Sequence, residues 1–346
     1  MKAAHAMIIG LCVMLCATTL HAQEKKDDTR TGWFQKAKWG VFMHYMADTV
    51  CKAPTVESWN QAVGSFDVEG LADQLASAGA GYFVLTLGQN SGFFCAPNAT
   101  YDSLVGITPS KCAKRDLPGD LSAALKKRGI RLMVYLPAGA PDRDKEAMEK
   151  LEWQNGKHPF WSYRNGTPKG EDSRLVSFQN KWESVIADWS KRWGKNVCGW
   201  WFDGCYFPDA MYRHPDAPNF ESFAAAARAG NGDSIVAFNP GVENPVITLT
   251  PAEDYTAGEI NEPGKVVCEG SRVGTAQFQM LSYLGPNWCA KPPRFTAEQV
   301  VQYTRNITDK GGVVTWDVPP DGVTGRILPE FLEQLQALGK ALGTAK

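Results

Sequence analysis

An aspartate directly after a run of large apolar residues is the sharpest chemical feature of this sequence. Asp203 follows Trp200, Trp201 and Phe202 and precedes Gly204. A short apolar run of this kind is typical of a buried strand, and a carboxylate at a strand end lies where α/β barrels place catalytic groups. The glycine lets the chain turn at once and leaves room beside the carboxylate. An aspartate in this position can also simply hydrogen-bond its own turn.

A second carboxyl group is needed if Asp203 takes part in cleaving a glycosidic bond. One group then attacks the sugar or activates water, and the other protonates the leaving oxygen. The two groups can come from different strands, so their separation in the sequence does not reveal their distance. Glu259 is the favoured partner, and Glu253 and Glu262 compete with it. Each of the three can equally be a solvated loop residue.

Polar and aromatic residues near the predicted strand ends are candidates for binding a sugar. A pyranose presents C–H groups on one face and hydroxyls around its rim, which suits flat apolar rings with a polar edge. Core packing is the ordinary role of any single tryptophan, and a lone histidine after a strand is often a satisfied core residue. The candidates for sugar binding are His44, Trp59, Gln89, Asn90, Tyr135, Trp201, Asn239, Trp288 and Trp316.

Strand-like runs alternate with helix-like stretches along the chain. The predicted strands cover residues 39–44, 82–87, 131–136, 199–202, 234–238, 277–282 and 312–316. The predicted helices cover residues 68–78, 121–128, 179–193, 220–228, 296–308 and 327–342. This alternation predicts a parallel sheet, and a weaker eighth strand near residues 254–259 completes an α/β fold of the (β/α)₈ TIM-like barrel type. The polar residues 141–173 predict a long loop over the site.

Residues 1–22 predict a secretory signal peptide. Lys2 gives the positive start, residues 6–20 form an apolar stretch, and the small residue Ala22 precedes the expected cleavage point. The apolar stretch is short for a membrane span of about 20 residues, so cleavage is favoured over anchoring. Residues 23–346 are then expected to form a single soluble barrel domain that is secreted or periplasmic.

Charge and cysteine content narrow the possible partners and cofactors. The formal net charge is −1, and no strong block of either sign favours nucleic acid or an anionic membrane surface. No GxGxxG motif follows the first strand and no P-loop motif occurs, which disfavours nucleotide-binding folds. The cysteines after the predicted signal peptide show no zinc-ligand spacing. No metal and no organic cofactor is expected, and the oligomeric state stays open.

The sequence resembles the α-L-fucosidase family of retaining glycoside hydrolases (glycoside hydrolase family 29-like). Residues 33–44, WFQKAKWGVFMH, are similar to the opening segment of that family, and WWFDG at residues 200–204 contains its nucleophile motif. Further similar segments follow in the family's order, at residues 82–93, 117–135, 279–285 and 309–325. The resemblance implies that Asp203 is the nucleophile, Glu259 the acid/base, His44 a sugar-binding residue and Tyr135 part of the pocket wall.

Several positions depart from the family pattern. Gln89 and Asn90 replace a His-His pair that grips the sugar, and Asn239 stands where the family usually carries an arginine. Glutamine and asparagine can bond hydroxyls but carry no charge. The family's usual C-terminal β-sandwich is not expected, because the sequence ends with the last predicted barrel helix.

These observations predict an exported retaining exo-glycosidase that hydrolyses α-L-fucosides or a related glycoside through a covalent glycosyl-enzyme on Asp203. Its partner would be an oligosaccharide or a glycoconjugate glycan. The changed pocket residues also allow a carbohydrate-binding protein that has kept the barrel without catalysis. An endo-acting or inverting hydrolase on the same scaffold is a third possibility.

Overall fold

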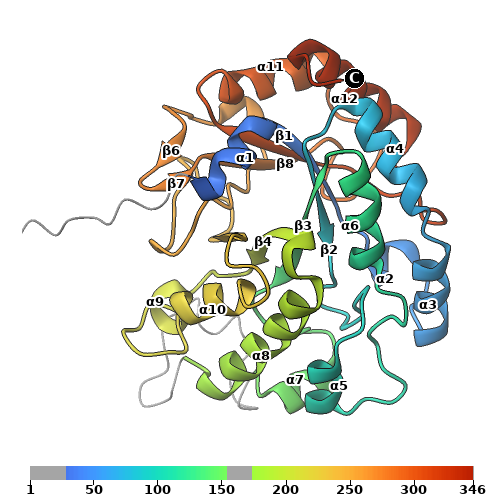
Figure 1. Cartoon of the computed structure of the whole chain (residues 1–346), viewed down its shortest axis with the longest axis vertical. Coiled ribbons are helices and arrows are strands. Elements are labelled where there is room, and N and C mark those ends of the chain that lie inside the picture. The colour runs from blue at the N-terminus through green and yellow to red at the C-terminus, as the bar shows by residue number, and fades with distance from the viewer. Residues whose placement is uncertain (1–28, 154–173, 346) are drawn as a thin grey trace, which may run out of the picture.

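A curled sheet of parallel strands forms the centre of the structure, a computed structural model that describes residues 29–153 and 174–345. Its seven strands follow the order β5-β4-β3-β2-β1-β9-β8, and all neighbours run parallel (Figure 1). The strands are β1 (Trp39–Met43), β2 (Tyr82–Thr86), β3 (Arg131–Pro137), β4 (Val197–Asp203), β5 (Ile235–Phe238), β8 (Gln279–Tyr283) and β9 (Val313–Asp317). The predicted α/β barrel class is confirmed. The predicted signal peptide lies outside the described residues.

Residues 254–260 bridge β5 and β8, at the position predicted for the eighth strand. The N–H of Asp254 donates to Val236 O in β5 at 2.9 Å, and the N–H of Ile260 donates to a carbonyl of β8 at 2.9 Å. This segment pairs with β8 at one isolated bridge, between Glu259 and Leu281, and does not form a continuous ladder of hydrogen bonds. Gly258 interrupts the strand, because its φ of +57° lies outside the extended region. Glycine is required at this position, since a Cβ would lie 1.8 Å from a carbonyl oxygen of β8.

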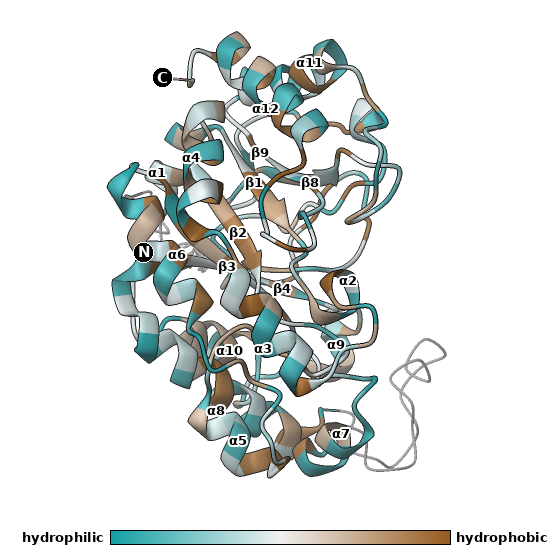
Figure 2. Cartoon of the chain, turned by 90° about the vertical axis from the view of Figure 1, so that its right-hand side faces the viewer, coloured by the Kyte–Doolittle hydropathy of each residue, from teal (hydrophilic) through white to brown (hydrophobic). Residues whose placement is uncertain are grey.

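Helices surround the curled sheet, most of them against its outer face, while the first helix packs against the interior layer through Phe34 (Figures 1 and 2). They are α1 (Thr29–Ala37), α2 (Ala47–Val50), α3 (Val56–Ser65), α4 (Val68–Ala78), α5 (Ala99–Val105), α6 (Leu117–Lys127), α7 (Lys145–Leu151), α8 (Val176–Trp193), α9 (Pro208–Met211), α10 (Phe220–Ala227), α11 (Ala297–Thr308) and α12 (Pro329–Leu342). The 3₁₀ helices η2 (Gly194–Asn196) and η3 (Pro263–Lys265) and the hairpin of β6 (Arg272–Val273) and β7 (Ala276–Gln277) complete the fold. No helix within the described ranges has the length and apolarity to cross a membrane.

Two apolar layers pack on the two faces of the sheet. Alternate residues of a strand point to opposite faces. Tyr82 and Ile235 therefore pack in the barrel interior, whereas their neighbours Phe83 and Val236 pack against the helices. Figure 2 shows apolar colour along the strands, while the helices carry both polar and apolar residues. Burial on both faces explains why the strands are continuous apolar runs in the sequence.

Two predicted boundaries differ from the structure. Helix α6 begins at Leu117 instead of residue 121, because the side chain of Asp116 caps its first turn. The prediction of an unbroken loop over residues 141–173 is wrong in its first part, where α7 forms behind a cap provided by Asp144. The remainder of that segment lies outside the described residues.

Candidate active site

A cavity of about 330 Å³ opens at the carboxyl ends of the strands, where barrel enzymes carry their chemistry. It combines the two predicted carboxylates with aromatic and polar side chains from several strands. Its lining residues are Phe42, His44, Met46, Thr49, Gln89, Tyr135, Trp201, Asp203, Glu259, Leu281, Trp288 and Cys289. Most of the residues predicted for the site therefore meet in one cavity.

Strand geometry brings the two carboxylates to this cavity in two ways. Asp203 lies two residues after Trp201, a member of the interior layer, and so points to the same face of β4. Glu259 follows the interruption at Gly258 and is placed by its bridge to Leu281 of β8, which belongs to the same interior layer. Gly204, with a φ of +81°, turns the chain away directly behind Asp203, as the sequence predicts.

The carboxylate of Asp203 is held by side chains from other parts of the barrel. The hydroxyl of Tyr135 in β3 donates to Oδ2 at 2.6 Å, and Nδ2 of Asn239 after β5 donates to Oδ1 at 2.8 Å. Tyr206 donates to Oδ1 over a longer 3.4 Å. Gln89 Nε2 in turn donates to the Tyr135 oxygen at 2.7 Å. The carboxylate therefore has a fixed orientation, set mainly by the shorter hydrogen bonds from Tyr135 and Asn239 on neighbouring strands.

Asn239 connects the two carboxylates. Its side chain is fully buried, and Nδ2 donates both to Asp203 and, at 2.6 Å, to Oε2 of Glu259. Its own oxygen accepts from the N–H of Gly241 at 3.0 Å. The sequence predicted Asn239 as a sugar-binding residue, but its amide hydrogens are used by the carboxylates.

The environment of Glu259 favours the protonated form of its carboxyl group more than water does. Burial raises its pKa, the nearby charge of Asp203 raises it further, and the hydrogen bond from Asn239 and the proximity of His44 lower it. The competing candidates have other partners. Glu253 is buried and accepts backbone N–H groups, among them that of Phe238 at 3.0 Å, and Glu262 pairs on the surface with a neighbouring lysine. Of the three candidates, Glu259 is the one that lines the cavity.

His44 is fixed by a buried carboxylate that the sequence analysis did not select. Its Nδ1 lies 2.8 Å from Oδ1 of Asp317, and Oδ2 of Asp317 accepts the N–H of Cys289 at 2.8 Å. Asp317 is 1% exposed and ends β9. With Nδ1 held in this way, Nε2 is the ring nitrogen that can meet a ligand.

The family model described as alpha-L-fucosidase matches residues 56–345. The chain belongs to the α-L-fucosidase family. The family predicted from the sequence motifs is confirmed. No curated protein matches the chain in sequence.

Solved structures share the fold of this α-L-fucosidase family member. Endo-fucoidan hydrolase MfFcnA4 from glycoside hydrolase family 107 aligns with a TM-score of 0.68 at 18% identity, over 91% of this chain and 53% of that one. α-L-Fucosidase AlfC from Lactobacillus casei, in complex with its α-L-fucose product, aligns with a TM-score of 0.58 at 15% identity, over 91% and 98%. A bacterial fucosidase with an iminocyclitol inhibitor aligns with a TM-score of 0.62 at 18% identity, over 92% of this chain and 75% of that one. This chain spans about half the length of MfFcnA4.

Aromatic rings form one wall of the fucosidase-family cavity. Tyr135 and Trp201 are stacked with centroids 5.3 Å apart, and Trp201 Nε1 donates to Ala257 O at 3.0 Å. Trp288 also lines the cavity, with its ring centroid 5.6 Å from that of His44. Gln89, with Tyr135 and Asp203, also borders an adjoining cavity of about 140 Å³, to which Asn90 belongs.

The described part of the chain gives little support for a bound metal ion or for a cysteine nucleophile. No group of three or more His, Cys, Asp or Glu residues is arranged there to hold a metal ion, and its cysteines are free thiols. Burial and then the charge of Asp317 raise the pKa of the Cys289 thiol to about 12. The thiol that lines the cavity is therefore protonated near neutral pH and is a poor nucleophile.

Two tryptophans predicted to bind sugar lie in the core instead. Trp59 is 1% exposed on α3, and its Nε1 donates to Phe94 O at 2.9 Å. Trp316 is fully buried and donates to Thr304 in α11 at 3.0 Å. Trp316 occupies an outward position of β9, where side chains pack against the helices, so the next residue, Asp317, is the one that enters the barrel.

Replacing Trp59 with alanine should therefore affect stability first. We expect the free energy of unfolding to fall by about 3–5 kcal/mol, because the change leaves a large cavity and an unpaired carbonyl. Urea unfolding measures this loss. Trp288→Ala, which removes a half-exposed ring from the cavity wall, should lose far less stability. Equal unfolding midpoints for the two variants would contradict the assignment of Trp59 to the core.

Proposed function

We propose that this chain is an exported retaining exo-glycosidase that hydrolyses α-L-fucosides or a related glycoside. Family membership supports the substrate class. The predicted signal peptide at residues 1–22 supports export. The observation that carries the mechanism is the single amide nitrogen of Asn239 between two carboxylates.

The shared amide limits the distance between the two carboxylates. Asn239 Nδ2 lies 2.8 Å from Oδ1 of Asp203 and 2.6 Å from Oε2 of Glu259. These two oxygens cannot be farther apart than the sum of those distances. Retaining pairs are separated by about 5–5.5 Å and inverting pairs by ~6.5–9.5 Å. The arrangement therefore favours double displacement over direct attack by water.

The reaction proceeds in two steps. An oxygen of Asp203 attacks the anomeric carbon, the bond from that carbon to the leaving oxygen breaks, and Glu259 gives its proton to that oxygen. In the second step, water loses a proton to Glu259 and attacks the anomeric carbon, which releases Asp203 and the sugar. The pKa of Glu259 is raised by burial and by the charge of Asp203, and this shift favours the acid form that the first step needs. Tyr135 and Asn239 hold the carboxylate of Asp203 for attack.

Trapping the covalent intermediate tests this mechanism. A 2-deoxy-2-fluoro-α-L-fucosyl fluoride should form a glycosyl ester that hydrolyses slowly, because the fluorine at C2 destabilises the second transition state. Intact mass should increase by one fluorosugar, and peptide mapping should place the label on Asp203. A labelled residue other than Asp203, or hydrolysis products of inverted configuration, would overturn the proposal.

Changing Glu259 to alanine should separate good from poor leaving groups. We expect roughly 10²–10⁴-fold slower hydrolysis of an unactivated disaccharide, because protonation of its leaving oxygen is lost. A nitrophenyl fucoside should be affected less in its first step, since that leaving group needs little protonation. The wild-type fall of kcat/KM at high pH, caused by ionisation of Glu259, should disappear in the variant. Equal losses for both substrates with an unchanged pH profile would rule out the acid/base role.

The adjoining cavity favours one alternative, cleavage within a chain. Asp203, Gln89 and Tyr135 line both cavities, so a second sugar unit can lie beside the one that is cleaved. Neighbours such as MfFcnA4 are named as endo-fucoidan hydrolases. The size of the first products from a fucose oligomer distinguishes the two modes, because an exo-enzyme releases single sugars and an endo-enzyme releases shorter oligomers.

A further inference from the structure

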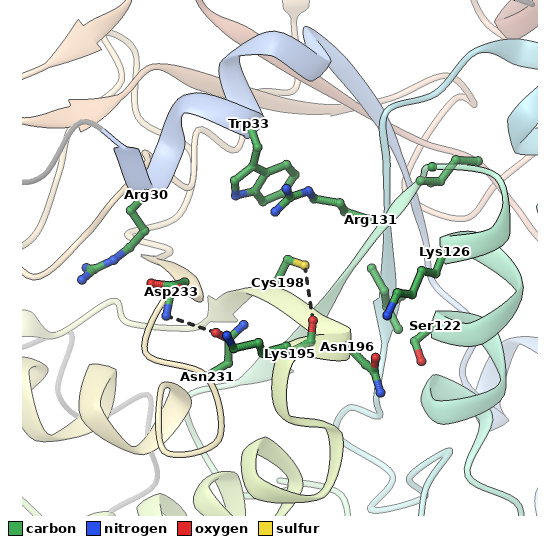
Figure 3. Close-up of a pocket in the computed structure, with 13 residues that line it drawn as sticks. Arg30, Trp33, Ser122, Lys126, Arg131, Lys195, Asn196, Cys198, Asn231 and Asp233 are labelled. Carbon is green, nitrogen blue, oxygen red and sulfur yellow. Dashed lines mark hydrogen bonds between the residues drawn. The ribbon is translucent and has the colours of Figure 1, made fainter.

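A second, larger cavity of about 710 Å³ lies at the opposite end of the barrel (Figure 3). It is bordered by the first residues of β3, by η2 and β4, by the last turn of α6, by α1 and by the loop before β5. The amino ends of barrel strands carry no part of the proposed reaction. This cavity is therefore separate from the active site.

The charge around this cavity is strongly positive. Its cationic lining residues are Arg30, Lys126, Arg131 and Lys195, and its one carboxylate is Asp233. Arg30 lies 3.2 Å from Asp254, which also pairs with Arg228 outside the cavity, so the charge of that carboxylate is already balanced. Cations gathered around a concave surface attract anions more strongly than the same charges spread over a convex surface.

Arg131 is prepared to bind an anion. Its guanidinium lies over the ring of Trp33, 4.6 Å from the ring centroid, and Figure 3 shows the two side chains together at the cavity. Stacking holds the guanidinium plane in place, and the guanidinium also contacts the thiol of Cys198 at the cavity. A guanidinium has five N–H donors in a planar fork, so it can still bond an oxyanion or a carboxylate. Lys126 and Lys195 add charge without fixed geometry.

We propose that this cavity binds an anionic polysaccharide. The volume of 710 Å³ exceeds what a single small anion occupies, and the cations lie along its rim from α1 to α6, which suits an extended chain. A carbohydrate polymer fits a glycoside hydrolase, and in this respect the inference rests on the proposed function. A polymer bound in this cavity would raise the local concentration of cleavable sugar units near the active site at the opposite end of the barrel.

Binding of dextran sulfate, polygalacturonate and neutral dextran to the full mature chain tests the proposal. The wild-type protein should bind dextran sulfate or polygalacturonate, with an affinity that falls as the salt concentration rises, and it should not bind neutral dextran. Lys126→Glu combined with Lys195→Glu should weaken binding at least about tenfold, or about 1.4 kcal/mol. Lys114→Glu combined with Lys340→Glu makes the same charge change at exposed positions outside the cavity lining and should weaken it less than about twofold.

Each contrary outcome would overturn the proposal. These are no binding by wild type, equal losses in both double variants, or a single-stranded DNA oligonucleotide that binds as tightly as the polymers. Hydrolysis of a nitrophenyl fucoside should be equal in wild type and in the cavity variant, because these lysines lie at the far end of the barrel. Failure of the proposed function would instead appear as absent hydrolysis in wild type, so the two failures are distinguishable.

Discussion

Replacing Asp203 with alanine is expected to lower kcat on a fucoside by roughly four orders of magnitude or more, as loss of a covalent nucleophile does. The aromatic wall and His44 remain, so KM should change little. Added azide should restore part of the turnover, because it fits the space left by the carboxylate and attacks the same carbon. The product would then be a glycosyl azide of inverted configuration, identified by NMR.

A matched control uses a carboxylate away from the cavity. Asp73 is exposed and pairs with Arg128 on the surface, an interaction worth about 0–1 kcal/mol. Asp73→Ala should therefore keep wild-type kcat and show no response to azide. If Asp203→Ala retains wild-type activity, Asp203 is not the nucleophile and the proposed mechanism fails.

Asn239→Ala has the second-largest expected effect. The change leaves both carboxylates without a shared donor, and we expect kcat to fall by about 10²–10³-fold, as when one preorganised donor is lost from an active site. The hydrogen bond from Asn239 lowers the pKa of Glu259 in the wild type. Its removal raises that pKa further, so the acid form persists to higher pH. The high-pH limb of the kcat/KM profile should therefore move to higher pH.

Asn98 provides the control for this variant. It is fully buried, and its Nδ2 donates to Val185 O at 2.9 Å, far from the cavity lining. Asn98→Ala should lower stability, because it leaves a buried carbonyl unpaired. Its pH profile should stay at the wild-type position. A shift of the same size in both variants would mean that the Asn239 effect reflects general loosening of the protein.

The barrel and its central carboxylate were predictable because they depend on local patterns. Apolar runs identify strands buried on both faces, and an acid just beyond such a run lies at the strand end. Asp203 meets both conditions. Glu259 was harder to identify, because its segment includes Gly258 and lacks a regular strand pattern. It was the preferred one of three candidate glutamates, and the family resemblance then implied the same residue.

The errors and omissions at the site have three physical causes. The prediction for Trp316 ignored the alternation of β9, which points that ring outward and sends Asp317 inward. The role of Asn239 depends on contacts between residues far apart in the sequence, which no local pattern encodes. Tyr206, three residues after Asp203, was missed because a tyrosine in a turn has no distinctive signal.

The irregular closure of the barrel divides the catalytic machinery into a rigid and an adaptable half. Asp203 ends a seven-residue strand that is paired on both sides, so changes in nearby loops move it little. Glu259 lies on the segment with isolated bridges. The residues between these bridges are buried, and a Cβ at Gly258 would meet a carbonyl of β8, so changes that move the proton donor should leave Tyr255, Ala257 and Gly258 intact. Directed evolution toward new leaving groups should therefore begin with the exposed residues that follow, Asn261 and Glu262.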